Sequence, residues 1–194
     1  MASEDSFASF VSLACHDLRT PLATVSGFAH TLRQNEIGQP ADRYVEMIQA
    51  ASGQIAEILD ELGLAARIEA GRFSPHVTEA DTLELAEAAA GLVGEKAIAK
   101  GTGSVVHVDR EPTERALAAL ARCALRHGGL EQVELSAEGA LVTISPVLED
   151  VVPIILGEDL KDLGAAAADR LVESLGGSLS VEADRLLVRL PVSD

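Results

Sequence analysis

A histidine and an aspartate stand side by side near the start of the chain, at His16 and Asp17, with Thr20 four residues after the histidine. An imidazole titrates close to neutrality, so an accessible histidine can act as a nucleophile or a proton carrier. At about 100° per residue of helix, His16 points away from the apolar residues Ala14 and Leu18. Thr20 shares the face of His16, because residues four apart are neighbours on a helix. Asp17 can reach the imidazole edge, so the sequence predicts an exposed polar cluster of these three residues.

An amphipathic helix is predicted to carry this cluster, from about Ser6 to Asn35, with Asp5 or Ser6 as its N-terminal cap. Its apolar residues recur mainly at alternating spacings of four and three, which is the pattern of a helix packed in a bundle. They are Phe7, Val11, Ala14, Leu18, Leu22, Val25, Ala29 and Leu32. Pro21 has no N–H to offer the Asp17 carbonyl, so we expect the turn after the histidine to be bent and loosened.

A second amphipathic helix follows a predicted turn at 35–40, in which Pro40 is placed to begin it. It ends near Gly71, and its apolar residues are Tyr44, Ile48, Ala51, Ile55, Ile58, Leu62 and Ala65. Two long helices joined by a short loop form an antiparallel hairpin. One hairpin cannot cover both apolar seams, so we expect a homodimer in which two hairpins form a four-helix bundle. His30 faces much the same way as His16, but it has no motif around it and we interpret it as solvated.

The periodicity changes beyond a predicted linker at 72–77. The predicted elements are a helix at 83–100, a strand at 105–108, a helix at 113–127 capped by Thr113, strands at 132–136 and 140–145, a helix at 160–175, and strands at 178–182 and 186–190. His127 suits the dipole at its helix C-terminus, and we interpret it as structural. Helices on one face of a mixed sheet form an α/β sandwich, so we predict a hairpin domain at 1–71 and an α/β domain at 78–194.

The composition argues against several classes of partner. The formal net charge is −16 at pH 7, so the phosphates of nucleic acids and anionic membranes would repel the chain. The sequence has no apolar run of about 18 residues, so we expect no membrane span. The acidic start lacks the basic region of a secretory signal, and Cys15 and Cys123 are too few for a disulfide framework. We therefore expect a cytoplasmic protein with reduced thiols.

The residues from His16 to Leu22 read His-Asp-Leu-Arg-Thr-Pro-Leu. This run resembles the H-box of two-component sensor histidine kinases, in which the histidine of a dimerising helical hairpin carries a phosphoryl group. The order of the later elements, and the run from Leu171 to Gly177, are similar to the ATP-binding domain that follows the hairpin in that family. The resemblance covers nearly the whole chain and implies a dimeric four-helix bundle followed by an ATPase-like α/β domain.

The ATP-binding half departs from the family pattern at its nucleotide site. The two asparagine positions of the family, one of which holds Mg²⁺, are Ala119 and Cys123 here, and neither offers an oxygen ligand. Pro146 stands where the family has the aspartate that reads the adenine amino group. Asp162 opens a glycine box that keeps one glycine of two, and it would set a negative charge against a triphosphate. The stretch 151–160 is short for a nucleotide lid, so we expect this domain not to bind ATP with Mg²⁺.

An acceptor histidine without a nucleotide site resembles the histidine phosphotransferases of bacterial phosphorelays, which are dimers with a degenerate ATPase-like domain. That resemblance implies that His16 accepts a phosphoryl group from the aspartate of one response regulator receiver and passes it to another. Asp17 would bind the other ring nitrogen, Thr20 would orient a water for dephosphorylation, and the receiver would supply Mg²⁺. Two other functions stay open: an ATP-dependent sensor kinase with a divergent nucleotide site, and a non-catalytic adaptor that binds receivers.

Overall fold

The computed structural model describes residues 2–34 and 41–192, and within them the side chains of 7, 9–32 and 41–192. The chain divides into two compact units, Met1–Gly63 and Leu64–Asp194. Each unit is described by itself below.

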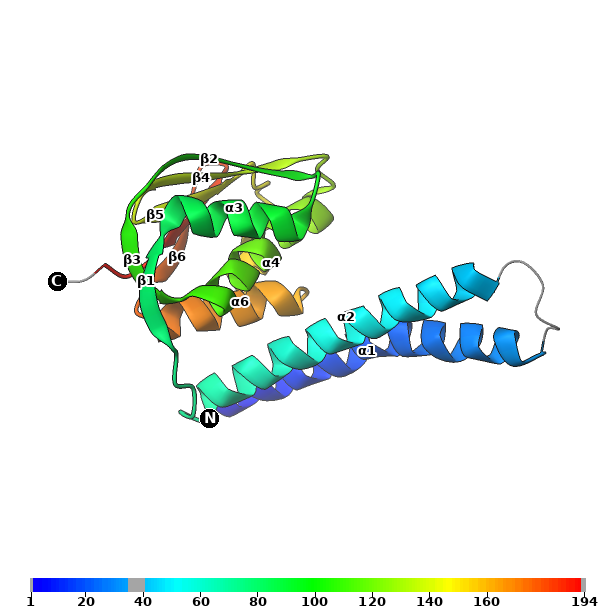
Figure 1. The fold of residues 1–194 in the computed structure, drawn as a ribbon. Coiled ribbons are helices and arrows are strands. Elements are labelled where there is room, and N and C mark those ends of the chain that lie inside the picture. The colour runs from blue at the N-terminus through cyan, green and yellow to red at the C-terminus, as the bar shows by residue number, and fades with distance from the viewer. Residues whose placement is uncertain (1, 35–40, 193–194) are drawn as a thin grey trace. The chain divides into compact units, whose positions relative to one another are not determined.

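The first unit is a helical hairpin, as predicted, and the end of its second helix, from Leu64 on, belongs to the second unit. The helices α1 (Ala2–Gln34) and α2 (Ala41–Glu69) run antiparallel beside each other (Figure 1). The rings of Phe28 on α1 and Tyr44 on α2 stack with their centroids 5.4 Å apart, which ties the two helices together near their connection. Because the α1 backbone is helical from Ala2, the predicted cap at Asp5 or Ser6 is wrong. The predicted turn at 35–40, with Pro40, lies outside the described residues.

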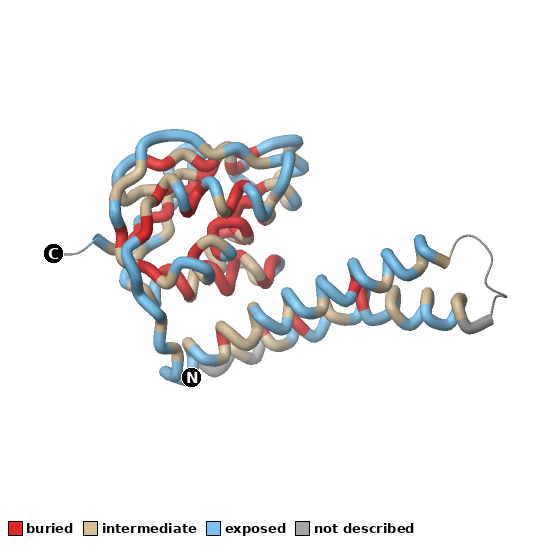
Figure 2. Tube along the Cα trace, viewed as in Figure 1, coloured by how far each residue is buried: buried red, intermediate tan, exposed pale blue. Residues whose placement is uncertain are grey.

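Burial along the hairpin follows a narrow stripe on each helix. On α1, Phe10 and Ala14 are completely buried and Pro21 is also buried, while Leu22 is 50% exposed. The buried stripe of α1 is therefore displaced by one residue from the predicted seam at this point, since neighbours in sequence lie about 100° apart on a helix. On α2 the predicted seam is confirmed, because all seven of its residues are buried or half-buried. Figure 2 shows how little of the hairpin is buried compared with the second unit.

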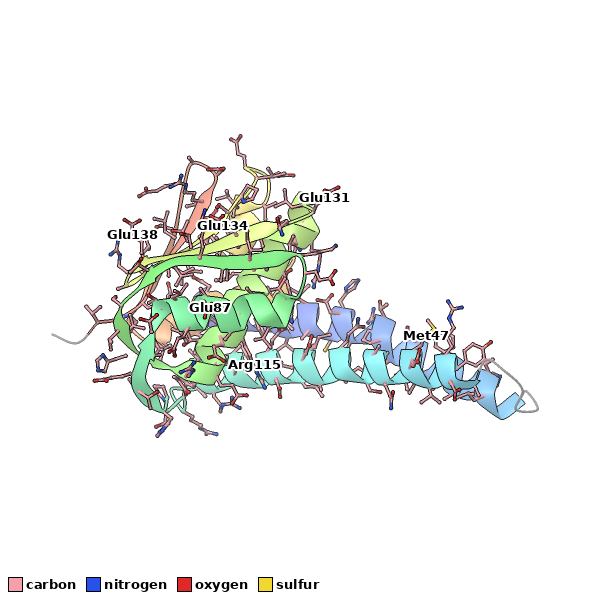
Figure 3. All side chains as sticks on the ribbon, turned by 45° about the horizontal axis from the view of Figure 1, so that its top comes forward. Met47, Glu87, Arg115, Glu131, Glu134 and Glu138 are labelled. Carbon is pink, nitrogen blue, oxygen red and sulfur yellow. The ribbon has the colours of Figure 1, made fainter. Side chains whose placement is uncertain are left out.

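Large apolar side chains remain exposed outside these stripes. Leu22 on α1 and Leu59 on α2 are about half exposed, at 50% and 51%. Val45 and Met47 on α2 are 43% and 38% exposed, and Figure 3 shows Met47 projecting from its helix. A helix packed against a single neighbour buries one stripe, so these side chains lie outside the stripes that the hairpin of one chain covers.

The second unit is an α/β sandwich, as predicted. Its elements are β1 (Val77–Asp81), α3 (Thr82–Val93), β2 (Ala97–Gly103), β3 (Val105–Asp109), α4 (Arg110–Gly128), β4 (Val133–Gly139), β5 (Leu141–Ser145), α5 (Val152–Ile155), α6 (Leu163–Ser174), β6 (Ser178–Glu182) and β7 (Arg185–Arg189). The main sheet has the strand order β2-β4-β5-β7-β6, in which β2 pairs with β4 in parallel and the other neighbours are antiparallel. The strands β1 and β3 form a separate antiparallel pair. Helices α3, α4 and α6 cover one face of the main sheet (Figure 1).

Three predicted boundaries in this unit are wrong. The helix predicted at 83–100 ends at Val93, because Gly94 adopts φ 89° and stops it, and β2 follows. Thr113 is not a cap: α4 begins at Arg110, and the Thr113 hydroxyl donates to the Asp109 carbonyl at 2.7 Å. The helix predicted from 160 begins at Leu163. The strands β1 and β2 and the short helix α5 were not predicted.

The core of the second unit lies between the sheet and its helices. Its largest fully buried side chains come from helices and strands alike: Leu85, Leu117, Leu120, Leu135, Ile144, Ile155, Leu171 and Leu186. The outer surface is acidic, and Glu131, Glu134 and Glu138 lie along β4 and just before it (Figure 3). Of these, Glu134 pairs with Lys100 on the neighbouring strand at 2.8 Å. In the part of the chain that the structure describes, no helix is long and apolar enough to cross a membrane.

Candidate functional site

His16 lies on the exposed surface of α1, as predicted, with 76% of its side chain accessible. Its Nδ1 atom lies 3.1 Å from Oδ1 of Asp17, whose side chain is 34% exposed. An ionised carboxylate can only accept a hydrogen bond, so this contact favours the tautomer with its proton on Nδ1. Nε2 then carries the free electron pair, and it lies on the side of the ring away from Asp17. The pair therefore presents a nucleophilic nitrogen to solvent.

Thr20 lies one helical turn after His16, and it is exposed. It lines a shallow groove along α1 together with Arg19, Ala23, Thr24, Gly27, Phe28 and Thr31. The Thr24 hydroxyl donates to the Thr20 carbonyl at 3.0 Å, so that carbonyl has a side-chain partner in addition to the helix. The structure thus joins His16 to Asp17 by a direct contact, and it places Thr20 next along the same helix.

Pro21 lies inside α1, and the helix continues through it. Its ring is buried, in contrast to the exposed His16 and Thr20 before it. A proline has no N–H, so the Asp17 carbonyl loses its usual partner four residues on. The buried ring of Pro21 and the exposed ring of His16 therefore mark opposite faces of the same stretch of helix. His30, two heptads later, is exposed.

The residues that replace the family's nucleotide ligands lie in the second unit, and two of them, Cys123 and Asp162, are close together. Asp162 is 5% exposed and acts as the N-terminal cap of α6, with Oδ1 accepting from the Ala165 N–H at 3.0 Å. Its Oδ2 lies 3.1 Å from Nε2 of His127 and 3.4 Å from a guanidinium nitrogen of Arg126. The carboxylate predicted to face a triphosphate is therefore buried and already paired.

Cys123 lies one turn before His127 on α4 and is completely buried. Burial, and then the nearby Asp162 carboxylate, raise the pKa of the Cys123 thiol far above its usual range, so the thiol is neutral at pH 7. Ala119 on the same helix is half-buried. Neither side chain carries an oxygen that could bind Mg²⁺. Pro146 follows β5 after a cis peptide bond.

The cluster of Cys123, His127 and Asp162 was missed as a unit by the sequence analysis. Its sulfur, nitrogen and oxygen atoms all lie within 4.8 Å of one another. Cys123 and His127 are four apart on a helix, which is a local signal for a shared face. Asp162 is 35 residues beyond His127, and the packing of α4 against α6 brings it there.

Asp169 on α6 is a further carboxyl group with an unusual environment. Burial, and then the neighbouring Glu173, raise the pKa of Asp169 to about 6, while Arg170 opposes the shift. This group did not figure in the sequence analysis.

Comparisons with known proteins find proteins that are similar to each of the two units. Residues 8–71 match the family model for the His Kinase A (phospho-acceptor) domain. Histidine protein kinase DivJ of Caulobacter vibrioides is 28% identical over 194 aligned residues, which cover 90% of this chain and 32% of that protein. Histidine kinase 3 of Arabidopsis thaliana is 26% identical over 112 residues, which cover 57% of this chain and 11% of that protein. The chain therefore spans a third or less of the length of these relatives.

Solved structures support the same assignment of folds. The Acinetobacter baumannii histidine kinase AdeS aligns with a TM-score of 0.70 and 16% identity, covering 92% of this chain and 98% of that one. The ATP binding domain of PrrB from Mycobacterium tuberculosis aligns with a TM-score of 0.50 and 22% identity, covering 61% of this chain and 99% of that one. Residues 8–71 are therefore a His Kinase A phospho-acceptor domain, the chain is similar to histidine kinases over most of its length, and the second unit has the fold of the kinase ATP-binding domain.

Proposed function

We propose that this chain is a histidine phosphotransferase, in which His16 accepts a phosphoryl group from the aspartate of one response regulator receiver and donates it to another. The observation that carries this proposal is the exposed His16 ring with Nδ1 held by Asp17 and Nε2 turned outward. This pair lies within the residues that match the phospho-acceptor family model. Receiver proteins are therefore the partners that the site fits.

The chemistry assigned to the pair is a reversible displacement at phosphorus. Nε2 of His16 attacks the aspartyl phosphate of the receiver, so an N–P bond forms and the O–P bond to the aspartate breaks. The aspartate leaves as a carboxylate, and the imidazole ring becomes positively charged as it bonds to phosphorus. Asp17, 3.1 Å from Nδ1, stabilises that charge and fixes the tautomer. Transfer to the second receiver is the same step reversed.

We propose that Thr20 promotes hydrolysis of the phosphorylated His16, which competes with transfer to a receiver. Its hydroxyl lies on the exposed side of α1, one turn from the phosphorylated ring. A hydroxyl at that distance can orient a water for attack on the phosphoryl group. This step consumes the phosphorylated histidine without a receiver, so Thr20 would set how long the phosphorylated form lasts.

The second unit is proposed to have lost ATP and Mg²⁺ binding. Its residues do not fit the nucleotide: Ala119 and Cys123 offer no oxygen to Mg²⁺, and the buried Asp162 would oppose phosphate charge. Asp162 is also held by His127 and by the α6 backbone, so it cannot swing aside without losing both partners. The receiver's own acidic pocket would then supply the Mg²⁺ that phosphoryl transfer needs.

The functional form is proposed to be a homodimer through the hairpin. The exposed apolar residues Leu22, Val45, Met47 and Leu59 lie outside the stripe that packs α1 on α2. Val45 and Leu59 point to the same side of α2, because 14 residues are nearly four full turns. A second hairpin packed on that side would complete a four-helix bundle and remove these two side chains from water.

The test incubates the purified chain with a phosphorylated receiver, with and without ATP, and measures acid-labile phosphohistidine. The expected result is labelling from the receiver in both conditions and none from [γ-³²P]ATP alone. His16→Gln should abolish labelling, while the matched change His30→Gln on the same helix should leave it intact. Labelling from ATP alone would assign the chain an autokinase activity. If the chain binds the receiver but no phosphohistidine forms, the chain is a non-catalytic adaptor.

A further inference from the structure

We propose that Cys123, His127 and Asp162 form a zinc site that joins α4 to the N-terminus of α6. The proposal stands apart from phosphotransfer at His16, because the three residues belong to the second unit. Two of these residues, Cys123 and Asp162, stand where the family pattern has its nucleotide site, and the proposal assigns them a ligand.

The geometry of the three donors suits a tetrahedral ion. Zinc binds thiolate sulfur at about 2.3 Å and imidazole nitrogen or carboxylate oxygen at about 2.0–2.2 Å, so its ligands stand roughly 3.2–3.7 Å from one another. His127 Nε2 and Asp162 Oδ2 are already 3.1 Å apart, and the widest separation in the cluster is within 4.8 Å. A change of about 1 Å at one side chain closes the site, with water as a fourth ligand.

The chemistry of the donors selects zinc over magnesium. Sulfur and imidazole nitrogen are ligands for zinc and similar transition metals, whereas Mg²⁺ requires an octahedral set of oxygens. When the ion binds, the thiol proton of Cys123 leaves to solvent and an S–Zn bond forms. The Cys123 thiolate and the Asp162 carboxylate then carry two negative charges, which balance the ion inside a buried site.

Supporting contacts hold two of the donors in place. The Ala165 N–H fixes Oδ1 of Asp162 at 3.0 Å, which leaves Oδ2 directed at His127. His127 is part of the last turn of a long helix, so its position is set by the packing of α4 on α6. Zinc would replace the proton that Nε2 shares with Asp162, and the imidazole proton would sit on Nδ1.

One neighbour opposes the ion, and it gives the proposal a second test. Arg126 places a guanidinium nitrogen 3.4 Å from Asp162 Oδ2. Its side chain is 67% exposed, so it can turn into solvent when a cation enters. Removal of this charge should therefore tighten metal binding several-fold, an effect that a purely structural hydrogen-bond cluster would not produce.

The experiment titrates Co²⁺ and then Zn²⁺ into the full chain without an affinity tag, reduced with a phosphine. Wild type should bind one Co²⁺ per chain and show a thiolate-to-cobalt charge-transfer band, which Zn²⁺ then abolishes. Cys123→Ser should lose the band, and His127→Gln should weaken binding at least about 100-fold. Cys15→Ser removes the other cysteine, which is exposed on α1, and should bind as wild type does. Arg126→Gln should bind more tightly.

The proposal fails if wild type gives no thiolate band, or if the band follows Cys15 instead of Cys123. If Cys123→Ser does not fold by circular dichroism, His127→Gln decides, since it keeps the buried thiol and the helix. Unchanged binding by folded His127→Gln would overturn the site.

Discussion

Nε2 of His127 lies 3.1 Å from Oδ2 of Asp162, and this contact joins the end of α4 to the beginning of α6. The aspartate is almost completely buried, and its second oxygen caps α6. One side chain thus satisfies a helix terminus and pairs with a neighbouring helix.

Asp162→Ala should destabilise the second unit, because α6 loses its cap and His127 loses its partner. The cap alone is worth about 0.5–2 kcal/mol. Asp162→Asn is the matched control, since an amide oxygen can still accept from the Ala165 N–H, and it should retain most of the cap. Urea unfolding followed by circular dichroism measures both. Equal stability of the alanine variant and wild type would contradict the structural role.

The raised pKa of Asp169 predicts that the free energy of unfolding of the second unit falls as pH rises. Its pKa is raised to about 6 in the folded chain by burial, whereas an unfolded aspartate titrates near 3.9. The folded state therefore binds the proton more tightly, and this contribution to stability is full below about pH 4 and is lost as pH rises through about 6. Asp169→Asn should flatten this slope and raise the midpoint of thermal unfolding at pH 7. Melting curves at several pH values test it, and an unchanged slope would count against it.

Asp17→Asn should slow phosphoryl acceptance by His16 by about 10²-fold or more. The amide can still reach Nδ1, but it lacks the negative charge that stabilises the positively charged phosphorylated ring. Single-turnover transfer from a labelled receiver measures the rate, and circular dichroism checks that the substitution of this half-buried side chain leaves the fold intact. A rate within a factor of two of wild type would assign Asp17 no part in the chemistry.

Leu59→Glu should dissociate the proposed dimer. The side chain is 51% exposed in one hairpin, and burial of an unpaired carboxylate against a second hairpin would cost several kcal/mol. Sedimentation velocity at micromolar concentration should show a dimer for wild type and a monomer for the variant. Gln54→Glu adds the same charge at an exposed polar residue of α2 and should stay dimeric. A monomeric wild type would refute the dimer.

The sequence predicted those features that depend on neighbours along the chain. The His16–Asp17 pair and the α2 seam follow from helical spacing, and the hairpin of β6 and β7 follows from two short strands around Ala183-Asp184. The helix predicted at 83–100 was too long because its alanines favour helix strongly enough to mask the stop at Gly94. Local spacing also did not predict contacts between segments that are far apart in the sequence.

Two cases show that limit. The strand β1 is defined by its pairing with β3, in which Glu79 lies opposite His107, and no pattern within 77–81 alone predicted it. The Asp162–His127 contact joins residues 35 apart, and α4 must pack on α6 before it exists. Sequence patterns of period two or 3.6 report which face of an element is apolar, but they do not report which distant element will cover it.

The parallel pairing of β2 with β4 has a consequence for the order of assembly. Strands β4 and β5 join through a tight turn, and so do β6 and β7, whereas β3 and the whole of α4 lie between β2 and β4. Closing that long loop costs more configurational entropy than closing a hairpin, and the cost must be met before the parallel ladder forms. β2 is also an edge strand, held in the sheet on one side. It is the strand expected to join the sheet last and to leave it first, so local opening of this unit begins at β2 rather than at the central strand β5.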